Sequence, residues 1–218
     1  MNTLKDKLRL YLVTDRSWSD KIGLCEQVET SLKKGVTFLQ LREKHLEKDA
    51  FLALAEEMKA IAGRYKVPFV INDDVDIAIA CDADGVHIGQ DDEGVAETRR
   101  RLGTEKILGV SVGTVEEALK ATQEGADYLG VGAMFPTTTK GDATAVAIET
   151  LREICNAVDV PVVAIGGIST DNIGFLQDSG VSGVAVVSAI LSKPDCGHAA
   201  EDLRKKCDVL FGKVEEEL

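Results

Sequence analysis

The residues of this sequence that could do chemistry gather in short polar stretches, each directly after an apolar run. The clearest is FVINDDVD, residues 69–76, in which an apolar run ends in Asn72, Asp73 and Asp74. Neighbouring carboxylates repel and raise one another's pKa, so the stretch calls for a positive partner. Another carboxylate, Asp92 in GQDD, follows the apolar run at 84–89. Asp73 and Asp92 provide the oxygen ligands that Mg²⁺ takes, and no histidine–cysteine cluster favours zinc instead.

These aspartates also have a simpler explanation. A helical pattern begins near residue 74, and negative charge stabilises the N-terminus of a helix. Spacing alone does not separate the two explanations, and we expect both to hold. Asp74 would then cap the helix while Asp73 binds the metal.

Cations, hydroxyls and glycines follow the other apolar runs. QLREK, residues 40–44, carries Arg42 and Lys44, which suit phosphate oxygens, although a surface cluster at a helix start explains this stretch alone more simply. The long polar loop MFPTTTKGDATA at 134–145 resembles an anion cradle. AIGGIST and VVSAI end the last two runs, which is the usual phosphate-binding corner of a (β/α)8 barrel. For His87 in GVHIG we leave two roles open, a barrel-interior residue or an aid to substrate orientation.

The elements that must position these groups alternate between strand and helix. Strands are predicted at 9–15, 36–42, 68–73, 84–89, 106–111, 126–132, 161–167 and 183–188. Helices are predicted at 21–34, 48–62, 74–81, 94–102, 115–124, 147–158, 171–179 and 197–211. Thr114 and Glu117 form a capping-box pattern, and Gly63, Gly103 and Gly125 are expected as helix stops. Eight such units and a weak internal repeat predict an α/β fold, a single-domain (β/α)8 TIM barrel over residues 1–218.

An open doubly wound sheet is the alternative fold, but no G-x-G-x-x-G follows the first strand. A closed barrel brings the ends of all its strands into one mouth, where the polar stretches would meet. That mouth would hold two anion sites, one of them with a divalent cation. Two phosphorylated substrates and no evident nucleophile indicate a substitution at carbon with diphosphate departing.

Composition excludes several other classes of protein. The formal net charge is −12, and the one basic run, Arg99–Arg101, lies in a helical pattern, which argues against nucleic-acid binding. No segment approaches the roughly 18 apolar residues of a membrane span, and the first residues do not resemble a signal peptide, so we expect a cytoplasmic protein. The five cysteines form no C-x-x-C and are expected as reduced thiols. The oligomeric state stays open, a homo-oligomer included.

Eight motifs in order, YLVTDR, QLREK, INDD, GVHIGQDD, GVS, PTTTK, IGGI and VVS, resemble the thiamine-phosphate synthase (thiamine-phosphate pyrophosphorylase) family over almost the whole chain. The resemblance implies a transferase that joins 4-amino-2-methyl-5-hydroxymethylpyrimidine diphosphate to thiazole phosphate, releasing thiamine phosphate and diphosphate. It implies Mg²⁺ and a dissociative substitution. Whether the thiazole carries a 2-carboxylate stays open.

The resemblance also implies roles for individual residues. The pyrimidine diphosphate would be held by Gln40, Leu41, Arg42, Glu43, Lys44, Asn72, Ser111 and Lys140, and Mg²⁺ by Asp73 and Asp92. The thiazole phosphate would be held by Thr137, Thr139, Gly167, Val187 and Ser188. The residues expected to stabilise the leaving diphosphate are Arg42, Lys44, Ser111 and Lys140.

Three alternatives remain on the same barrel. A thiazole tautomerase-like (TenI-like) isomerase would not need both metal aspartates or the full PTTTK. A non-catalytic thiamine-pathway sensor would be expected to lose a rim cation or a metal aspartate. Another phosphate-binding barrel isomerase would need neither Asp73 nor Asp92, and both are present.

Overall fold

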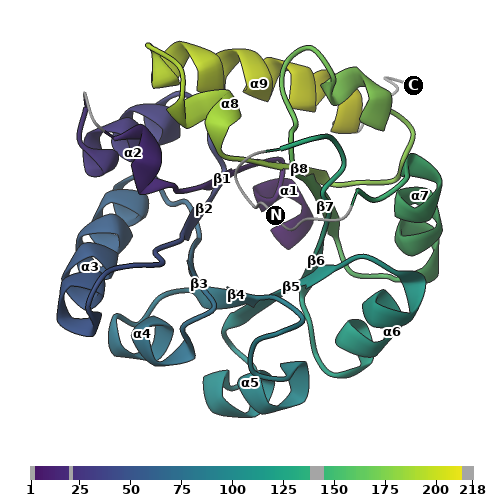
Figure 1. The fold of residues 1–218 in the computed structure, drawn as a ribbon, viewed down its shortest axis with the longest axis horizontal. Helices are drawn as coiled ribbons and strands as arrows, with labels where there is room; N and C mark the ends of the chain where they lie inside the picture. The colour runs from purple at the N-terminus through teal and green to yellow at the C-terminus, as the bar shows by residue number, and fades with distance from the viewer. Residues whose placement is uncertain (1–2, 20–21, 138–144, 213–218) are drawn as a thin grey trace.

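Eight parallel strands close into a barrel in the order of the sequence, with helices around the outside (Figure 1). The computed structural model describes residues 3–19, 22–137 and 145–212. The strands are β1 Leu10–Val13, β2 Phe38–Leu41, β3 Phe69–Asn72, β4 Gly85–Ile88, β5 Ile107–Val112, β6 Tyr128–Val131, β7 Val162–Ile165 and β8 Gly183–Val186. β8 pairs with β1, Val184 opposite Leu10, which closes the ring. The predicted barrel and all eight of its strands are confirmed.

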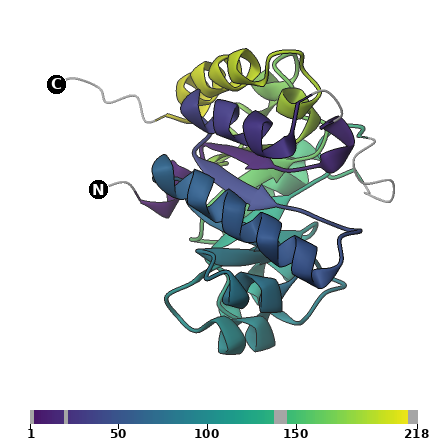
Figure 2. The same cartoon turned by 90° about the vertical axis from the view of Figure 1, so that its left-hand side faces the viewer.

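Helices of varied length connect the strands and lie along the barrel wall (Figure 2). The longer ones are α2 Leu24–Lys33, α3 Lys48–Arg64, α4 Val75–Ala80, α5 Val95–Leu102, α6 Val115–Gln123, α7 Ile148–Ala157 and α9 Cys196–Phe211. Short turns that the sequence did not predict are α1 Leu4–Lys7, η1 Arg16–Trp18 and α8 Ser188–Leu191. Among the described residues, none of these helices is both long and apolar enough to cross a membrane.

The helix predicted at 171–179 is wrong, because the structure has only one 3-10 turn there, η2 Ile173–Leu176. Gly174 lies inside the segment and Asp178 takes a φ of 58°, a left-handed conformation that ends a helical run.

The predicted helix ends are confirmed only in part. Gly103 and Gly125 follow their helices with φ of 78° and 104°, but Gly63 lies inside α3, and the left-handed residue after that helix is Lys66. The hydroxyl of Thr114 accepts from the Glu117 N–H at 3.2 Å. The Glu117 carboxylate accepts instead from the N–H of Gly113, one residue before the expected partner. The residues at which a helix starts and stops therefore depend on backbone conformation and hydrogen-bond partners that the short motif does not determine.

Both faces of the strands are buried, as is usual for a parallel barrel. One hydrophobic core lies between strands and helices, and a second lies inside the barrel and extends to its N-terminal end. In the second, Tyr11, Phe38 and Tyr128 pack edge to face, with ring centroids 4.6 to 6.0 Å apart. Leu4 of α1 packs against this cluster, and Figure 1 shows α1 across that end of the barrel. The opposite end is thus left for a cavity.

Candidate active site

A cavity of about 500 Å³ opens at the C-terminal ends of the strands. Every strand contributes to its wall, among them Tyr11 of β1, Gln40 of β2, Asn72 of β3, His87 of β4 and Ser111 of β5. Gly130 of β6, Ile165 of β7 and Ala185 of β8 complete the ring. Because the strands meet in one mouth, residues far apart in the sequence line one space.

Most of the predicted site residues line this cavity. They are Gln40, Arg42, Asn72, Asp73, Asp92, Ser111, Thr137, Gly167, Val187 and Ser188. Thr139 and Lys140 lie outside the described residues. The structure therefore brings these ten residues together, while their roles remain predictions.

Three predicted residues do not line the cavity. Leu41 is fully buried in the core between strands and helices, because it follows the inward-facing Gln40 and side chains alternate along a strand. The carboxylate of Glu43 accepts two hydrogen bonds from Arg16, at 3.0 and 3.3 Å. Lys44 lies beyond β2 and is likewise absent from the cavity wall. A substrate contact by any of these three would have to come from the backbone or from a shift of the side chain.

The two adjacent aspartates after β3 have different surroundings. Asp74 is the N-cap of α4, and its carboxylate accepts from the Ile77 N–H at 2.9 Å, which confirms the predicted cap. Asp73 takes a φ of 64°, and its own N–H donates to the His87 carbonyl at 2.8 Å. This left-handed turn directs the chain from the strand into the helix and leaves Asp73 in the cavity wall.

Asp92 reaches the same cavity from the loop after β4. Its Oδ2 accepts from the Gly89 N–H at 2.7 Å, and its Oδ1 makes no hydrogen bond with the described residues. Asp73 and Asp92 thus follow neighbouring strands, and both line one cavity. No cluster of three or more His, Cys, Asp or Glu side chains occurs among the described residues, so an ion there would take further ligands from water or substrate. Two carboxylates completed in this way suit Mg²⁺.

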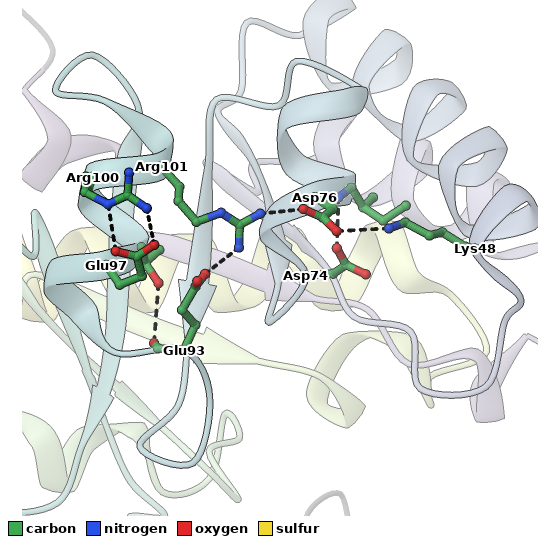
Figure 3. A network of polar contacts seen from close by, with 9 residues as sticks. Lys48, Asp74, Asp76, Glu93, Glu97, Arg100 and Arg101 are labelled. Carbon is green, nitrogen blue, oxygen red and sulfur yellow. Dashed lines mark hydrogen bonds and ion pairs between the residues drawn. The ribbon is translucent and has the colours of Figure 1, made fainter.

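An ion-pair network fixes the segments that carry these aspartates (Figure 3). Asp76 of α4 accepts from Lys48 at 3.0 Å and from Arg101 of α5, and these hydrogen bonds to cations lower the pKa of Asp76. Arg101 also donates to Glu93, next to Asp92, at 2.7 Å. The network therefore joins the Asp92 loop to the helix that begins at Asp74.

Arg99, the first residue of the basic run in α5, contacts neighbouring loops of the barrel. Arg99 donates to the carbonyls of Gly125 and Lys106 and to the Asp127 carboxylate, the last at 2.5 Å. Its side chain thereby ties α5 to the loops before β5 and β6. Arg99 therefore has a structural role.

A chain of buried polar side chains crosses the barrel beneath the cavity. Gln40 Nε2 donates to the Tyr11 hydroxyl, which lies 2.8 Å from the Tyr128 hydroxyl. That hydroxyl is 2.9 Å from His87 Nδ1, and His87 Nε2 is 2.9 Å from Ser111 Oγ. Both tyrosines are almost fully buried, and burial raises the pKa of each hydroxyl, so both stay protonated.

Sequence reasoning missed Tyr11 and Tyr128. A signal was available, because each tyrosine lies in an otherwise apolar strand, and a buried tyrosine hydroxyl needs a hydrogen-bond partner. Which partner it finds depends on the closed barrel. For His87 the structure supports the interior position, with one ring nitrogen toward the cavity residue Ser111.

The opposite wall of the cavity is made by the ends of β7 and β8. Gly166 and Gly167 take φ of 96° and 64°, and a Cβ at Gly167 would lie 2.5 Å from the Pro136 carbonyl. Only glycine fits both the conformation and this close approach. Gly167, Val187 and Ser188 line the cavity beside Thr137. In the closed strand order, this wall stands across the barrel from the Asp73 and Asp92 wall.

Fold and site together define a class, a (β/α)8-barrel enzyme with a cavity at the C-terminal ends of its strands into which polar residues are brought together. Residues 10–190 match the family model described as "Thiamine monophosphate synthase". The chain belongs to this thiamine-phosphate synthase family, whose members are transferases of thiamine biosynthesis.

Individual relatives agree along nearly their whole length. The chain is 47% identical over 207 residues to "Thiamine-phosphate synthase" of Clostridium tetani, covering 95% of this chain and 96% of the relative. It is 50% identical over 206 residues to the protein of the same name from Methanobrevibacter smithii, covering 94% and 97%. The solved structure "Thiamine phosphate pyrophosphorylase from Pyrococcus furiosus" superposes with a TM-score of 0.89 and 38% identity, over 96% of this chain and 100% of that one.

Proposed function

We propose that this chain condenses 4-amino-2-methyl-5-hydroxymethylpyrimidine diphosphate with thiazole phosphate to give thiamine phosphate and diphosphate. If the thiazole enters in its 2-carboxy form, the carboxylate leaves as carbon dioxide. The observation that supports this most directly is the division of one cavity into two walls. Asp73 and Asp92 stand on one wall, and Gly167 and Ser188 stand on the wall across the barrel. Such a cavity suits two anionic substrates that react in the space between.

The first wall fits a diphosphate that arrives with a divalent cation. Asp73 and Asp92 are the residues that would hold Mg²⁺, because their carboxylates line one cavity and Asp92 Oδ1 makes no hydrogen bond with the described residues. The bound ion would neutralise charge on the diphosphate. Arg42 adds a fork of donors suited to phosphate oxygens, and Asn72 and Ser111 add neutral donors. Lys44, Thr139 and Lys140 remain predicted contributors to the same task.

The second wall fits the thiazole phosphate. Thr137 and Ser188 carry hydroxyls, and Gly167 has no side chain between its backbone and the cavity. Backbone N–H groups and hydroxyls can donate to phosphate oxygens without adding a full charge. This wall would orient the thiazole nitrogen toward the carbon that loses diphosphate.

In the proposed reaction, diphosphate departs before the thiazole nitrogen attacks. The bond between the pyrimidine's exocyclic carbon and the diphosphate oxygen breaks, and its electron pair leaves with diphosphate. The ring amino group stabilises the cation that remains, and the thiazole nitrogen donates its lone pair to form the new carbon–nitrogen bond. Arg42 and Ser111 donate to oxygens whose negative charge grows as the bond breaks, so their effect is largest in the transition state.

The test is release of diphosphate that depends on both substrates and on magnesium. If the purified protein with magnesium and both substrates releases none, the proposed reaction is wrong. Conversion of a thiazole carboxylate phosphate without release of diphosphate would instead indicate the isomerase.

Asparagine variants test the metal site with little change of shape. Asp73→Asn and Asp92→Asn should each lower turnover by about 10²-fold or more, since each weakens the hold on the cation that would neutralise the leaving diphosphate. Both should also weaken binding of Mn²⁺ in the presence of inorganic diphosphate, measured by electron paramagnetic resonance. Asp178→Asn is a matched control, because Asp178 also takes a left-handed φ, 58°, and does not line the cavity. Normal Mn²⁺ binding by Asp92→Asn would remove that residue from the site.

A further inference from the structure

The polar chain beneath the cavity connects two residues of the cavity wall. Gln40 begins it on β2, and Ser111 ends it on β5. Tyr11, Tyr128 and His87 lie between them, each with its polar atoms engaged by the next member. The tyrosines are 1% and 0% exposed, so water does not complete their hydrogen bonding.

The number of protons on each side chain determines which group donates and which accepts in every hydrogen bond of this polar chain. The Tyr11 hydroxyl accepts from Gln40 Nε2, so its single proton goes to its other neighbour, the Tyr128 oxygen. Tyr128 then has its own proton to donate to His87 Nδ1. A neutral imidazole that accepts at Nδ1 carries its proton on Nε2, which donates to Ser111 Oγ. Ser111, as an acceptor there, keeps its own proton for the cavity.

We propose that Tyr11, Tyr128 and His87 form a positioning relay that gives the two cavity residues opposite hydrogen-bond characters, with Gln40 an acceptor and Ser111 a donor. The amide of Gln40 presents Oε1 to the cavity because Nε2 is held by Tyr11. Reversing one end requires reversal of every bond between, since each hydroxyl in the chain has one proton.

This assignment rests on the proposed function and specifies how the pyrimidine substrate is held. An acceptor at Gln40 suits the amino group of the ring, which must also release electron density to the cation. A donor at Ser111 suits an oxygen of the departing diphosphate. A Ser111 proton turned back toward His87 could not do so. The relay therefore acts on the chemical step more than on binding.

The first experiment reads the tautomer of His87 without any substrate. Protein labelled with ¹⁵N in its histidines has only three such residues, and His45→Gln and His198→Gln assign the remaining ring. We expect the proton on Nε2 and a hydrogen-bonded, unprotonated Nδ1. A proton on Nδ1 would mean that Gln40 presents its carbonyl to Tyr11 and that Ser111 donates to His87, and it would overturn the proposal. Because no turnover is measured, this result stands even if the proposed reaction fails.

The second experiment breaks the relay in the middle. In Tyr128→Phe, His87 Nδ1 loses its donor, and the Ser111 proton can turn toward Nε2 instead of the cavity. We expect kcat to fall about tenfold or more with less than a threefold change in KM. Tyr65→Phe is the matched control, since it also removes one hydroxyl. The Tyr65 hydroxyl donates to Glu29 at 3.2 Å, and Tyr65 does not line the cavity. Wild-type kcat in Tyr128→Phe, with wild-type diphosphate release intact, would overturn the relay and not the function.

A double variant separates positioning from general damage. If Tyr128 acts through Ser111, Tyr128→Phe should change kcat by less than twofold in a Ser111→Ala background. If both losses multiply in full, Tyr128 acts independently of Ser111 and the relay is refuted. Should Tyr128→Phe lose its native circular dichroism, the tautomer of His87 decides alone, because that measurement needs no substitution within the relay.

Discussion

A substitution at Gly109 of β5 tests how tightly the barrel interior is packed. It pairs with His87 on one side and with Tyr128 on the other. A Cβ added here would lie 2.1 Å from Tyr128 Cζ and 2.4 Å from His87 Nδ1. The variant Gly109→Ala therefore inserts one methyl group where these two side chains form a hydrogen bond.

The loss of unfolding free energy in Gly109→Ala depends on how far the side chains around the new methyl group must move. Ordinary contact between carbon atoms is about 3.5 Å, so the Tyr128 ring would have to retreat by about 1.4 Å. Phe38 and Tyr11 pack on that ring with centroids at 5.6 and 6.0 Å, which blocks the retreat. Overpacking of a core costs about 1–3 kcal/mol, and an unsatisfied buried polar group costs a similar amount. We expect unfolding free energy to fall by about 2–5 kcal/mol.

Thermal and urea unfolding followed by circular dichroism measure this loss. For a protein of this size, each kcal/mol lowers Tm by about 2–4 °C, so the midpoint should fall by about 4–20 °C. Gly63→Ala is the matched control, because a Cβ there has no neighbour within 4 Å and the residue lies inside α3. It should stabilise the protein by about 0.5–1 kcal/mol. If Gly109→Ala unfolds within about 0.5 kcal/mol of wild type, the interior is not packed as described.

Substitutions at three further aspartates test the helix caps and a surface ion pair. Asp74→Ala and Asp195→Ala each remove a side chain that caps a helix, so each should lower the unfolding free energy in urea by about 1 kcal/mol, while asparagine at either position should retain most of it. Hydrogen bonds from Lys106 and Lys59 lower the pKa of Asp82 to about 2, below the value of about 3.9 in an unfolded chain. Its contribution to stability is therefore full above about pH 4 and is lost as pH falls toward 2. Asp82→Asn should flatten the pH dependence of Tm in that window; an unchanged slope at low ionic strength would contradict the assignment.

The sequence was sufficient for the barrel and for most of the cavity wall. Strands such as Phe69–Asn72 are short apolar runs that end in polar groups, and the closed fold places those ends together without further information. The 3-10 turn at Ile173–Leu176 shows the limit of this reasoning, since apolar spacing suggested a helix that Gly174 and the turn at Asp178 do not continue.

The polar chain could not be predicted for a different reason. Tyr11, His87 and Tyr128 are far apart in the sequence and meet only because the register of the closed barrel points them inward at compatible heights. Gly109, between His87 and Tyr128, leaves the space for their hydrogen bond. Contacts of this kind depend on which residues face each other across the barrel, and an apolar–polar pattern within one strand does not contain that information.

The three carboxylates of residues 69–76 show how a run of like charges can be stable at a strand end. Asp76 is held by Lys48 and Arg101, and Asp74 by the first turn of α4. Of the three, only Asp73 lines the cavity. Removing charge should therefore have three separate effects: Asp76→Asn should weaken the link between α4 and α5 in a salt-dependent way, Asp74→Ala should loosen α4, and Asp73→Asn should reduce turnover with little loss of stability. Equal loss of stability in all three variants would mean that the stretch acts as one structural cluster, and it would remove the reason for assigning Asp73 to a metal.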